Sequence, residues 1–330
     1  MTVNSISRMR AVVVDIGTNS TRLLIADVAS DGQIAEIVRR SVVTRLGAGV
    51  DAGGSLAEEA CERVLSALAA FGAEIDAHRP GDGDAYPNLA VMTSAVREAR
   101  NGRRLAERVR SECGLDARVL TGEEEAKMTF LGAMSGRTAA VEPTVVIDIG
   151  GGSTEFIVGV GRTAGFHVSL EAGVVRMSER HIHSDPPAPA ELQELAADTY
   201  AVYDAGLPAD ERAPVRRGIA VAGTATSAAA IDQELDPYDP ERVHGYPLLL
   251  ATVEMLLARL ADMNESQRRT LVGLDPNRAP TIVAGMILLS QAMRAFDLDE
   301  VEVSEHDILH GGALSLVASV DSVPHRSSDT

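Results

Sequence analysis

One segment occurs twice in this chain, and it constrains the fold more than any other feature. Val145-Val-Ile-Asp-Ile-Gly-Gly-Gly-Ser-Thr-Glu155 aligns with Val12-Val-Val-Asp-Ile-Gly-Thr-Asn-Ser-Thr-Arg22 when Asp148 is placed on Asp15. Each copy is an apolar strand that ends in an Asp-Ile-Gly turn and continues into a second apolar strand. The repeat predicts two similar α/β lobes, each of which contributes one β-turn to a cleft between them.

The residue types of the two turns suit an anion. Residues 150–152 are all glycine, which lacks a Cβ and can direct successive backbone N–H groups at one anion. Asp148, at the end of its strand, is placed to hold a metal ion or a water. Arg22 in one copy replaces Glu155 in the other, so one lobe offers a cation where the other offers an anion. An isolated triple glycine would be read as a solvated hairpin turn, and the second copy disfavours that interpretation.

Length and composition limit the classes of protein to consider. The chain has 330 residues, enough for two domains with separate cores. The net charge of −18 argues against broad binding to nucleic acid or to anionic membranes. No secretory signal and no membrane-spanning run is recognisable, and Cys61 and Cys113 are expected to be reduced structural thiols. These features predict a cytoplasmic protein.

Cations are nevertheless concentrated in one segment. Six arginines lie close together in the sequence: Arg97, Arg100, Arg103, Arg104, Arg108 and Arg110. The planar guanidinium group binds phosphate oxygens in a bidentate manner, which makes this segment a candidate phosphate-binding element. The alternative is an exposed helix face, which is the more common situation for the last four.

In the first lobe, apolar periodicity and turn residues predict three strands, a long helix, and two further strand–helix units. The three strands are expected at about 11–16, 22–28 and 33–43, and the long helix at 55–78, with a Ser55–Glu58 capping box at its start. The two further units are a strand at 89–92 with a helix at 93–114, and a strand at 117–120 with a helix from 121. Three glutamates, 123–125, open that last helix. They complement the helix dipole, and one of them is also placed to act as a general base.

The second lobe repeats this order. We expect strands at 144–149, 153–160, 165–171, 218–222 and 300–303, and helices at 188–207, 247–262 and 278–296. Gly223 and Thr224 form a third strand–turn–helix junction suited to phosphate. The expected boundaries are 1–133 for the N-terminal lobe, 134–305 for the C-terminal lobe, a closing helix at about 306–320 that packs back on the first lobe, and a disordered tail at 321–330.

Two histidines at the closing helix are possible supporting groups for the site. His306 and His310 flank an expected Gly311-Gly312 turn, and we treat them only as groups that could support the cleft from behind. His181 and His183 are two positions apart, do not share a helix face, and are expected to be surface residues.

The duplicated unit resembles the actin-like, sugar-kinase and heat-shock ATPase superfamily, with its ribonuclease H-like lobes built from mixed sheets flanked by helices. Within it, the chain resembles the exopolyphosphatase/guanosine pentaphosphate phosphatase (Ppx/GppA) family over about residues 10–318. The resemblance rests on these motifs: Asp15-Ile-Gly-Thr-Asn-Ser20, Thr93-Ser-Ala-Val-Arg-Glu-Ala99, Gly122-Glu-Glu-Glu-Ala126, Asp148-Ile-Gly-Gly-Gly-Ser-Thr-Glu155, Gly223-Thr224 and Arg278-Ala279.

The resemblance implies hydrolysis of a terminal phosphoanhydride with Mg²⁺ or Mn²⁺, with Glu125 as the catalytic base and Asp148 as a second catalytic residue. It implies metal binding by Asp148 and Asp15. The implied phosphate-binding residues are Asp15, Gly17, Thr18, Asn19, Ser20, Arg22, Arg97, Gly150, Gly151, Gly152, Ser153, Glu155, Gly223 and Thr224. Positioning and charge neutralisation are also what phosphoryl transfer requires of a protein.

This chain departs from the family pattern in three places. Pro280 stands where many relatives have Asp, and Leu309-His310-Gly311 stands where they typically have Arg-Glu-Gly. The helical C-terminal region of longer relatives, associated with long polymers and dimer contacts, is absent from the sequence, so we expect short polyphosphate chains as substrates. A homodimer is expected from the family alone.

Four functions are compatible with the sequence. An exopolyphosphatase is the leading expectation, and a guanosine pentaphosphate 5′-phosphatase is the nearest alternative. An ATP-dependent kinase is disfavoured because Glu125 is placed to activate water. A non-catalytic sensor of nucleotides or alarmones is disfavoured because a binder gains little from an unpaired buried carboxylate that faces phosphates.

Overall fold

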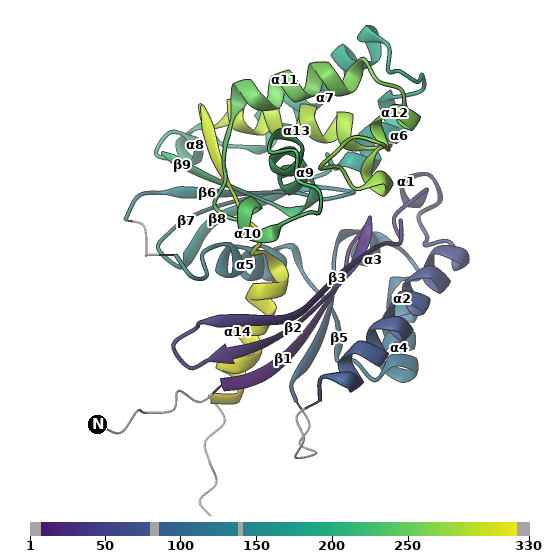
Figure 1. The fold of residues 1–330 in the computed structure, drawn as a ribbon, viewed down its shortest axis with the longest axis vertical. Helices are drawn as coiled ribbons and strands as arrows, with labels where there is room; N and C mark the ends of the chain where they lie inside the picture. Colours follow the sequence, from purple (N-terminus) through teal and green to yellow (C-terminus); the bar gives the residue numbers. More distant parts are fainter. Residues whose placement is uncertain (1–7, 80–85, 138–140, 322–330) are drawn as a thin grey trace, which may run out of the picture.

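The computed structural model describes residues 8–79, 86–137 and 141–321. The chain forms two lobes stacked along the long axis of the molecule, each built around one mixed β-sheet (Figure 1). The tail expected at 321–330 lies, apart from its first residue, outside the described residues. Within the described ranges, no helix is both long and apolar enough to cross a membrane.

The sheet of the first lobe has the strand order β3-β2-β1-β4-β5. Its strands are β1 (Arg8–Ile16), β2 (Ser20–Ala29), β3 (Ile34–Val43), β4 (Asn88–Met92) and β5 (Ala117–Val119). The first three are antiparallel neighbours, whereas β4 and β5 continue the sheet in parallel. The strands expected from the sequence in this lobe are confirmed.

The sheet of the second lobe repeats this order as β8-β7-β6-β9-β11, with β10 added at the edge. Its strands are β6 (Thr144–Ile149), β7 (Thr154–Val160), β8 (Thr163–Leu170), β9 (Arg217–Val221), β10 (Pro247–Leu249) and β11 (Glu300–Val303). The pairing directions also repeat, antiparallel through β6-β7-β8 and parallel through β6-β9-β11. The two lobes are therefore a structural duplication, as the repeated segment predicted.

Helices cover both faces of each sheet. In the first lobe, α2 (Glu58–Ala77), α3 (Ser94–Glu98) and α4 (Gly102–Cys113) lie on one face. The apolar residues of α2 recur every three or four positions, from Ala60 through Val64 and Leu68 to Phe71, so one stripe is buried. The opposite face is covered by α14 (Ile308–Asp321), whose Leu309 and Ala313 pack with Val13 and Leu24.

The second lobe buries its largest core on one face of its sheet. The covering helices are α6 (Val174–His181), α7 (Pro189–Gly206), α9 (Ala222–Asp232), α11 (Leu250–Ala261) and α13 (Ile282–Ala295). Nearly every residue of α13 is buried, as expected for a helix enclosed by other helices. The short helices are α1 (Val50–Gly53), α8 (Ala209–Arg212), α10 (Pro240–Val243), α12 (Glu265–Arg268) and the 3₁₀ turn η1 (Pro276–Arg278).

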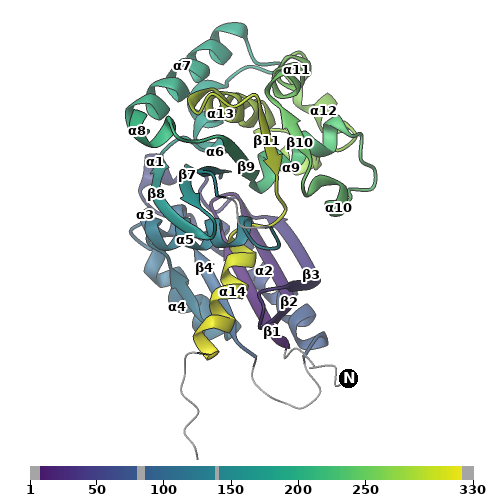
Figure 2. The ribbon, with the colours of Figure 1, turned by 90° about the vertical axis from the view of Figure 1, so that its left-hand side faces the viewer.

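Two helices connect the lobes. The helix α5 (Gly122–Ala133) leads out of the first lobe, and its Ala126, Phe130 and Ala133 pack on the sheet of the second lobe. The helix α14 brings the chain back to the first sheet, beside α5 (Figure 2). The sheets are thus separated by a layer that contains these two helices.

Three local expectations are wrong. Ser55 does not cap α2, which begins at Glu58 after Ala57; Asn101 instead fixes this segment through hydrogen bonds with the N–H and the carbonyl of Leu56. The helix expected at 93–114 is broken into α3 and α4. A Cβ on Gly102 would lie 1.9 Å from the carbonyl oxygen of Val96, so glycine allows the two helices to meet closely.

The third error concerns Gly311 and Gly312, which are not a turn but part of α14. A Cβ on Gly311 would lie 1.8 Å from the carbonyl oxygen of Met128 in α5. The glycines therefore allow close helix packing. One boundary also differs: the helix expected from about 247 begins at Leu250, because residues 247–249 form the edge strand β10.

Candidate active site

The two repeated turns face each other across a cavity of about 100 Å³ between the lobes. Each turn is closed in the same way: the N–H of Gly17 donates to the carbonyl of Ser20 at 3.0 Å, and the N–H of Gly150 donates to that of Ser153 at 3.0 Å. The strand register then places Arg22 opposite Asp15 and Glu155 opposite Asp148. Arg22 and Glu155, the one charge difference between the two copies, therefore both line this cavity.

In the first lobe this register makes a buried ion pair. Nε and Nη2 of Arg22 donate to Oδ2 of Asp15 at 2.9 and 2.6 Å, and Nη1 of Arg22 donates to Asp307. Burial alone would raise the pKa of Asp307, but Arg22 and Arg39 lower it to about 2. The Arg22 guanidinium is thus held by carboxylates on two sides.

In the second lobe the same register places two carboxyls side by side. Burial and the charge of Glu155 raise the pKa of Asp148. Burial and the charge of Glu125 raise the pKa of Glu155 to about 7, although the hydroxyls of Ser153 and Ser169 donate to its Oε1 at 2.5 and 2.6 Å. Among the described residues, neither Asp148 nor Glu155 forms an ion pair with an arginine or lysine side chain; Arg278 is the cation that the second lobe adds to the lining.

The three glutamates that open α5 have different surroundings. Glu124 closes a capping box with Thr121, and Glu123 pairs with Lys127 on the exposed face. Glu125 alone is buried and lines the cavity. The helix dipole therefore does not account for Glu125.

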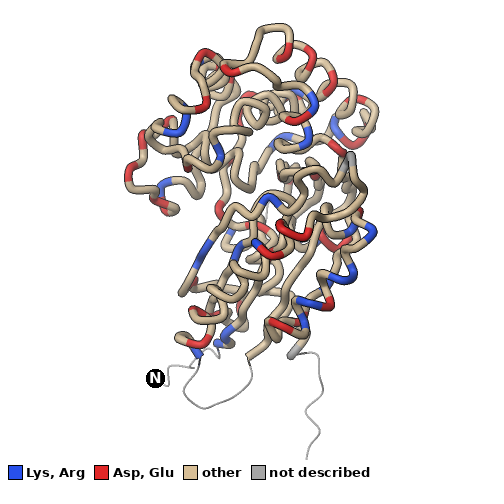
Figure 3. Tube along the Cα trace, turned by 90° about the vertical axis from the view of Figure 1, so that its right-hand side faces the viewer, with Lys and Arg blue, Asp and Glu red and all other residues tan. Residues whose placement is uncertain are grey.

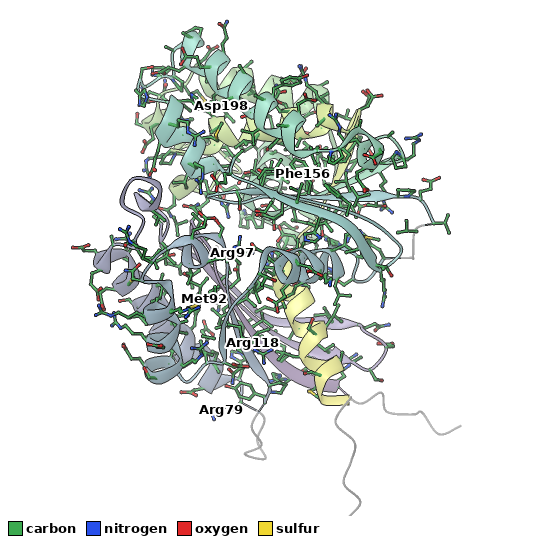
Figure 4. The ribbon with its side chains drawn as sticks, turned by 180° about the vertical axis from the view of Figure 1, so that it is seen from behind. Arg79, Met92, Arg97, Arg118, Phe156 and Asp198 are labelled. Atoms are coloured by element: carbon green, nitrogen blue, oxygen red, sulfur yellow. The ribbon has the colours of Figure 1, made fainter. Side chains whose placement is uncertain are left out.

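Arg97 holds Glu125 from behind. Its Nη1 donates to Oε2 of Glu125 at 2.6 Å and to the carbonyl of Leu120 at 3.2 Å. Figure 4 shows Arg97 at the level where the two lobes meet. Burial raises the pKa of Glu125 to about 7, despite the hydrogen bond and charge of Arg97, which lower it. A carboxyl with this pKa can accept a proton near neutral pH.

A third turn, at the junction of β9 and α9, completes the lining of the cavity. Ala222 there has a φ of 63°, a left-handed conformation unfavourable for a residue with a Cβ. Gly223 follows, and a Cβ on it would lie 1.3 Å from Nη1 of Arg278. Glycine at this position lets the Arg278 guanidinium lie against the start of α9, at the edge of the cavity.

The structure brings most of the expected site residues to this cavity. Its lining includes Asp15, Gly17, Thr18, Asn19, Ser20, Arg22, Glu125, Asp148, Gly150, Gly151, Ser153, Glu155, Gly223 and Thr224. Gly152 lies instead in a crevice beside it, near Ser94 and Thr18, and Arg97 reaches the cavity through Glu125. Because the N–H of Gly150 closes its own turn, the N–H groups of Gly151 and Gly152 are left as the candidate anion donors.

Several residues of the site were not expected from the sequence. Thr93, Ser94, Arg278 and Thr281 line the cavity, and Asp307 binds Arg22. Thr93, Ser94 and Arg278 belong to motifs of the family resemblance, which are the signal for them. Asp307 follows a strand end just before the closing helix, and its contact with Arg22 depends on packing between distant segments.

A second cavity of about 660 Å³ continues from the first. The two share Arg22, Ala222, Gly223 and Arg278. Its other cationic lining residues are Arg39, Arg40 and Arg269, and Tyr238 also faces it. A long anionic ligand could therefore extend from the small cavity into the large one.

The carboxylates of the small cavity suit a hard divalent cation. Oδ1 of Asp15 is buried without a hydrogen-bond partner among the described residues, while Oδ2 takes both bonds from Arg22. Asp15, Glu125, Asp148 and Glu155 would repel a polyanion unless a cation intervened. Carboxylate oxygens are the ligands preferred by Mg²⁺.

Comparison with known proteins agrees with this geometry. Residues 24–320 match the Ppx/GppA phosphatase family. The chain belongs to this family. It is 36% identical to exopolyphosphatase 2 of Mycobacterium tuberculosis, over 93% of this chain and 98% of that protein. It is 29% identical to exopolyphosphatase 1 of Mycobacterium bovis, over 89% of this chain and 84% of that protein.

Solved structures of Ppx/GppA proteins share the fold. A crystal structure of an exopolyphosphatase-like protein superposes with a TM-score of 0.87 at 31% identity, covering 96% of this chain and 99% of that one. The Aquifex aeolicus member of the Ppx/GppA family superposes with a TM-score of 0.80 at 28% identity, covering 96% of this chain and 99% of that one. The two duplicated lobes are thus those of a Ppx/GppA phosphatase.

Proposed function

We propose that this protein is an exopolyphosphatase, which removes the terminal orthophosphate from inorganic polyphosphate. The observation that carries the proposal is Glu125, a buried carboxyl with a pKa of about 7 in a cavity lined by the two repeated Asp-Ile-Gly turns. The similarity to exopolyphosphatases of Mycobacterium over nearly the whole chain supports the same activity.

In the proposed reaction, the oxygen of a water molecule attacks the terminal phosphorus. Glu125 accepts a proton from this water, and Arg97 keeps the carboxylate oriented toward it. The bridging P–O bond breaks, and its electron pair stays on the shortened polyphosphate, which leaves as an anion. Arg22 and the N–H group of Gly151, which both line the cavity, hold the oxygens of the terminal phosphate.

We infer that Mg²⁺ or Mn²⁺ is the cofactor. Asp15 and Asp148 would hold it, and the unpartnered Oδ1 of Asp15 supports this assignment. The bound cation supplies neutralisation of the phosphate charge. Glu155 is held by two serine hydroxyls and supports Asp148 from the neighbouring strand.

The remaining phosphates of the substrate are assigned to the larger cavity. Arg278 does not form an ion pair among the described residues and lies at the junction of the two cavities. Attack in line with the leaving oxygen directs the rest of the chain away from the attacking water, and the larger cavity would receive it. A cavity of about 660 Å³ suits a short polyphosphate segment.

The test is orthophosphate release from four substrates in Mg²⁺ or Mn²⁺: short polyphosphate, long polyphosphate, guanosine pentaphosphate and ATP. The proposal predicts release from polyphosphate, fastest for short chains. Release from guanosine pentaphosphate alone would reassign the protein to alarmone turnover. Absence of release from every substrate, with retained binding of a nucleotide, would favour a sensor.

The compartment proposed for this activity is the cytoplasm. Cys61 and Cys113 are both free thiols, Cys61 in the core of the first lobe and Cys113 at the end of α4. Unbridged cysteines are typical of a reducing compartment.

A further inference from the structure

Three histidines stack where the two lobes join, outside the cavity described above. The ring centroid of His306 lies 4.0 Å from that of His310 and 4.3 Å from that of His244. Nε2 of His310 is 2.8 Å from Oε1 of Glu36, and Nδ1 of His306 is 2.9 Å from Oγ of Ser135. The candidate active site uses none of these side chains.

These residues come from both connections between the lobes. Ser135 follows α5, where the chain leaves the first lobe, and His306 and His310 lie where it returns through β11 to α14. Glu36 is on β3, the edge strand of the first sheet, and His244 belongs to the second lobe. The views in Figures 1 and 2 place α14 between the first sheet and α5. The cluster thus joins elements on both sides of the two connections between the lobes, the segment after α5 and the segment from β11 to α14, which we call the hinge.

The ring nitrogens of His310 have different surroundings. Nε2 faces Glu36, whereas Nδ1 is buried and has no hydrogen-bond partner among the described residues. Imidazole nitrogens coordinate transition metals through their lone pairs.

We propose that Glu36, His306 and His310 bind one divalent transition-metal ion, such as Zn²⁺. One ligand atom from each residue lies within 4.8 Å of the other two. Bonds to tetrahedral zinc of about 2.0 Å place ligands roughly 3.4 Å apart, so the ligand atoms must approach one another. The partly exposed ring of His306 must also turn out of its stack on the buried His310, because an imidazole coordinates in its ring plane. The Glu36 side chain is 34% exposed and can make that approach, and it leaves the metal a path from solvent.

The neighbouring charges leave Glu36 available for this role. Arg39 lies 4.0 Å from Glu36 but only 2.5 Å from Oε2 of Glu305, which is its main partner. Two imidazoles and one carboxylate suit Zn²⁺, Co²⁺ or Ni²⁺, whereas Mg²⁺ prefers oxygen ligands alone. The proposed site therefore takes a different class of metal from the carboxylate cavity. A metal here links β3 to the returning connection and restrains the hinge.

The experiment uses the full-length protein, stripped of metals with a chelator and titrated with Co²⁺ in excess Mg²⁺. The wild type is expected to bind one Co²⁺ with the visible absorption bands of a nitrogen-ligated, low-coordinate ion. Glu36→Gln and His310→Gln are expected to lose at least tenfold in affinity, by analogy with the loss of metal-site partners. Zn²⁺ is expected to raise the Tm of the wild type and not that of Glu36→Gln.

His183→Gln is the matched control, because it removes an exposed histidine far along the chain and should bind Co²⁺ as the wild type does. His310 is fully buried and its substitution can unfold the protein, so the partly exposed Glu36→Gln decides the result. Equal Co²⁺ affinity in the wild type and in folded Glu36→Gln overturns the proposal. So does the absence of a nitrogen-ligated Co²⁺ spectrum in the wild type.

Discussion

Glu125 and Glu155 have the same raised pKa of about 7, but their oxygens have different partners. Oε1 of Glu155 accepts from the hydroxyls of Ser153 and Ser169, which fixes that carboxyl against its own sheet. Oε2 of Glu125 accepts from Arg97, and the hydrogen bonds of the described structure leave Oε1 of Glu125 open. This difference is why we assign the role of base to Glu125 and a supporting role to Glu155.

Arg97→Met should shift the pH dependence of the reaction. Arg97 stabilises the ionised form of Glu125 and lowers its pKa, so removal of the cation raises that pKa further above its usual value. The base must be ionised to act, and kcat/KM is therefore expected to rise with pH through about 7 in the wild type and at higher pH in Arg97→Met. The profile of kcat/KM against pH measures this. An unchanged midpoint would mean that another group controls it.

At the scale of elements, the repeated hairpin determines the site more than any single residue does. The same register in β1-β2 and β6-β7 directs the side chains at positions 22 and 155 toward one cavity. The period-2 alternation of a strand makes this placement strict, because a slip of one residue would turn both side chains to the other face of the sheet.

Close contact between α5 and α14 fixes the hinge, and Gly132 makes it possible. A Cβ on Gly132 would lie 1.8 Å from the carbonyl oxygen of Asp307, which is backbone and cannot turn away. Gly132→Ala should therefore destabilise the protein by about 2–4 kcal/mol, in the range of severe overpacking. Urea denaturation measures the loss.

Gly122→Ala is the matched control in the same helix, since no atom lies within 4 Å of its added Cβ. It should leave the free energy of unfolding unchanged or raise it slightly, because alanine favours helix. Equal stability of the two variants would contradict the tight crossing of α5 and α14.

The sequence predicted the elements with local patterns and missed those that depend on packing. The apolar runs were sufficient for most strands, the two Asp-Ile-Gly turns for a cleft between two lobes, and the family resemblance for most lining residues of the cavity. The expected capping box at Ser55 failed because the side chain of Asn101, distant in sequence, binds that segment instead. Arg278 and Asp307 reach the site through the positions of α9 and α14, and a local motif contains no information on those positions.

At the scale of the molecule, the excess of acidic residues is not confined to one face or one lobe. Acidic and basic positions are interspersed on both lobes (Figure 3). Of the arginine cluster, Arg108 binds Glu58, Glu62 and Glu112, and therefore has a structural role between α2 and α4. Only Arg97 of that cluster reaches the proposed catalytic centre.

Besides the pair of Arg39 with Glu305, an ion pair of Arg176 with Glu98 joins the lobes. Nη2 of Arg176, in α6 of the second lobe, lies 3.2 Å from Oε2 of Glu98, in α3 of the first. A partly exposed pair of this kind contributes about 0.5–1 kcal/mol, so Glu98→Gln should raise the open fraction and the KM for polyphosphate about two- to fivefold. Steady-state kinetics measure the change.

Glu171→Gln serves as the control for this prediction. Glu171 lies 3.5 Å from the same Arg176 but belongs to the second lobe, so its loss does not separate the lobes. The KM of Glu171→Gln for polyphosphate should equal that of the wild type. If Glu98→Gln and Glu171→Gln raise KM equally, the pair between the lobes has no role in closure.

The measurement that most directly tests the account is orthophosphate release from short polyphosphate by Glu125→Gln. Loss of a general base predicts a fall in kcat of about 10²–10⁴-fold. Binding of polyphosphate, measured by calorimetry, should stay within a few-fold of the wild type because the turns and Arg22 are intact. Glu123→Gln, an exposed neighbour on the same helix, should be as active as the wild type. A Glu125→Gln enzyme with a kcat within tenfold of the wild type would contradict the assignment of Glu125 as the base.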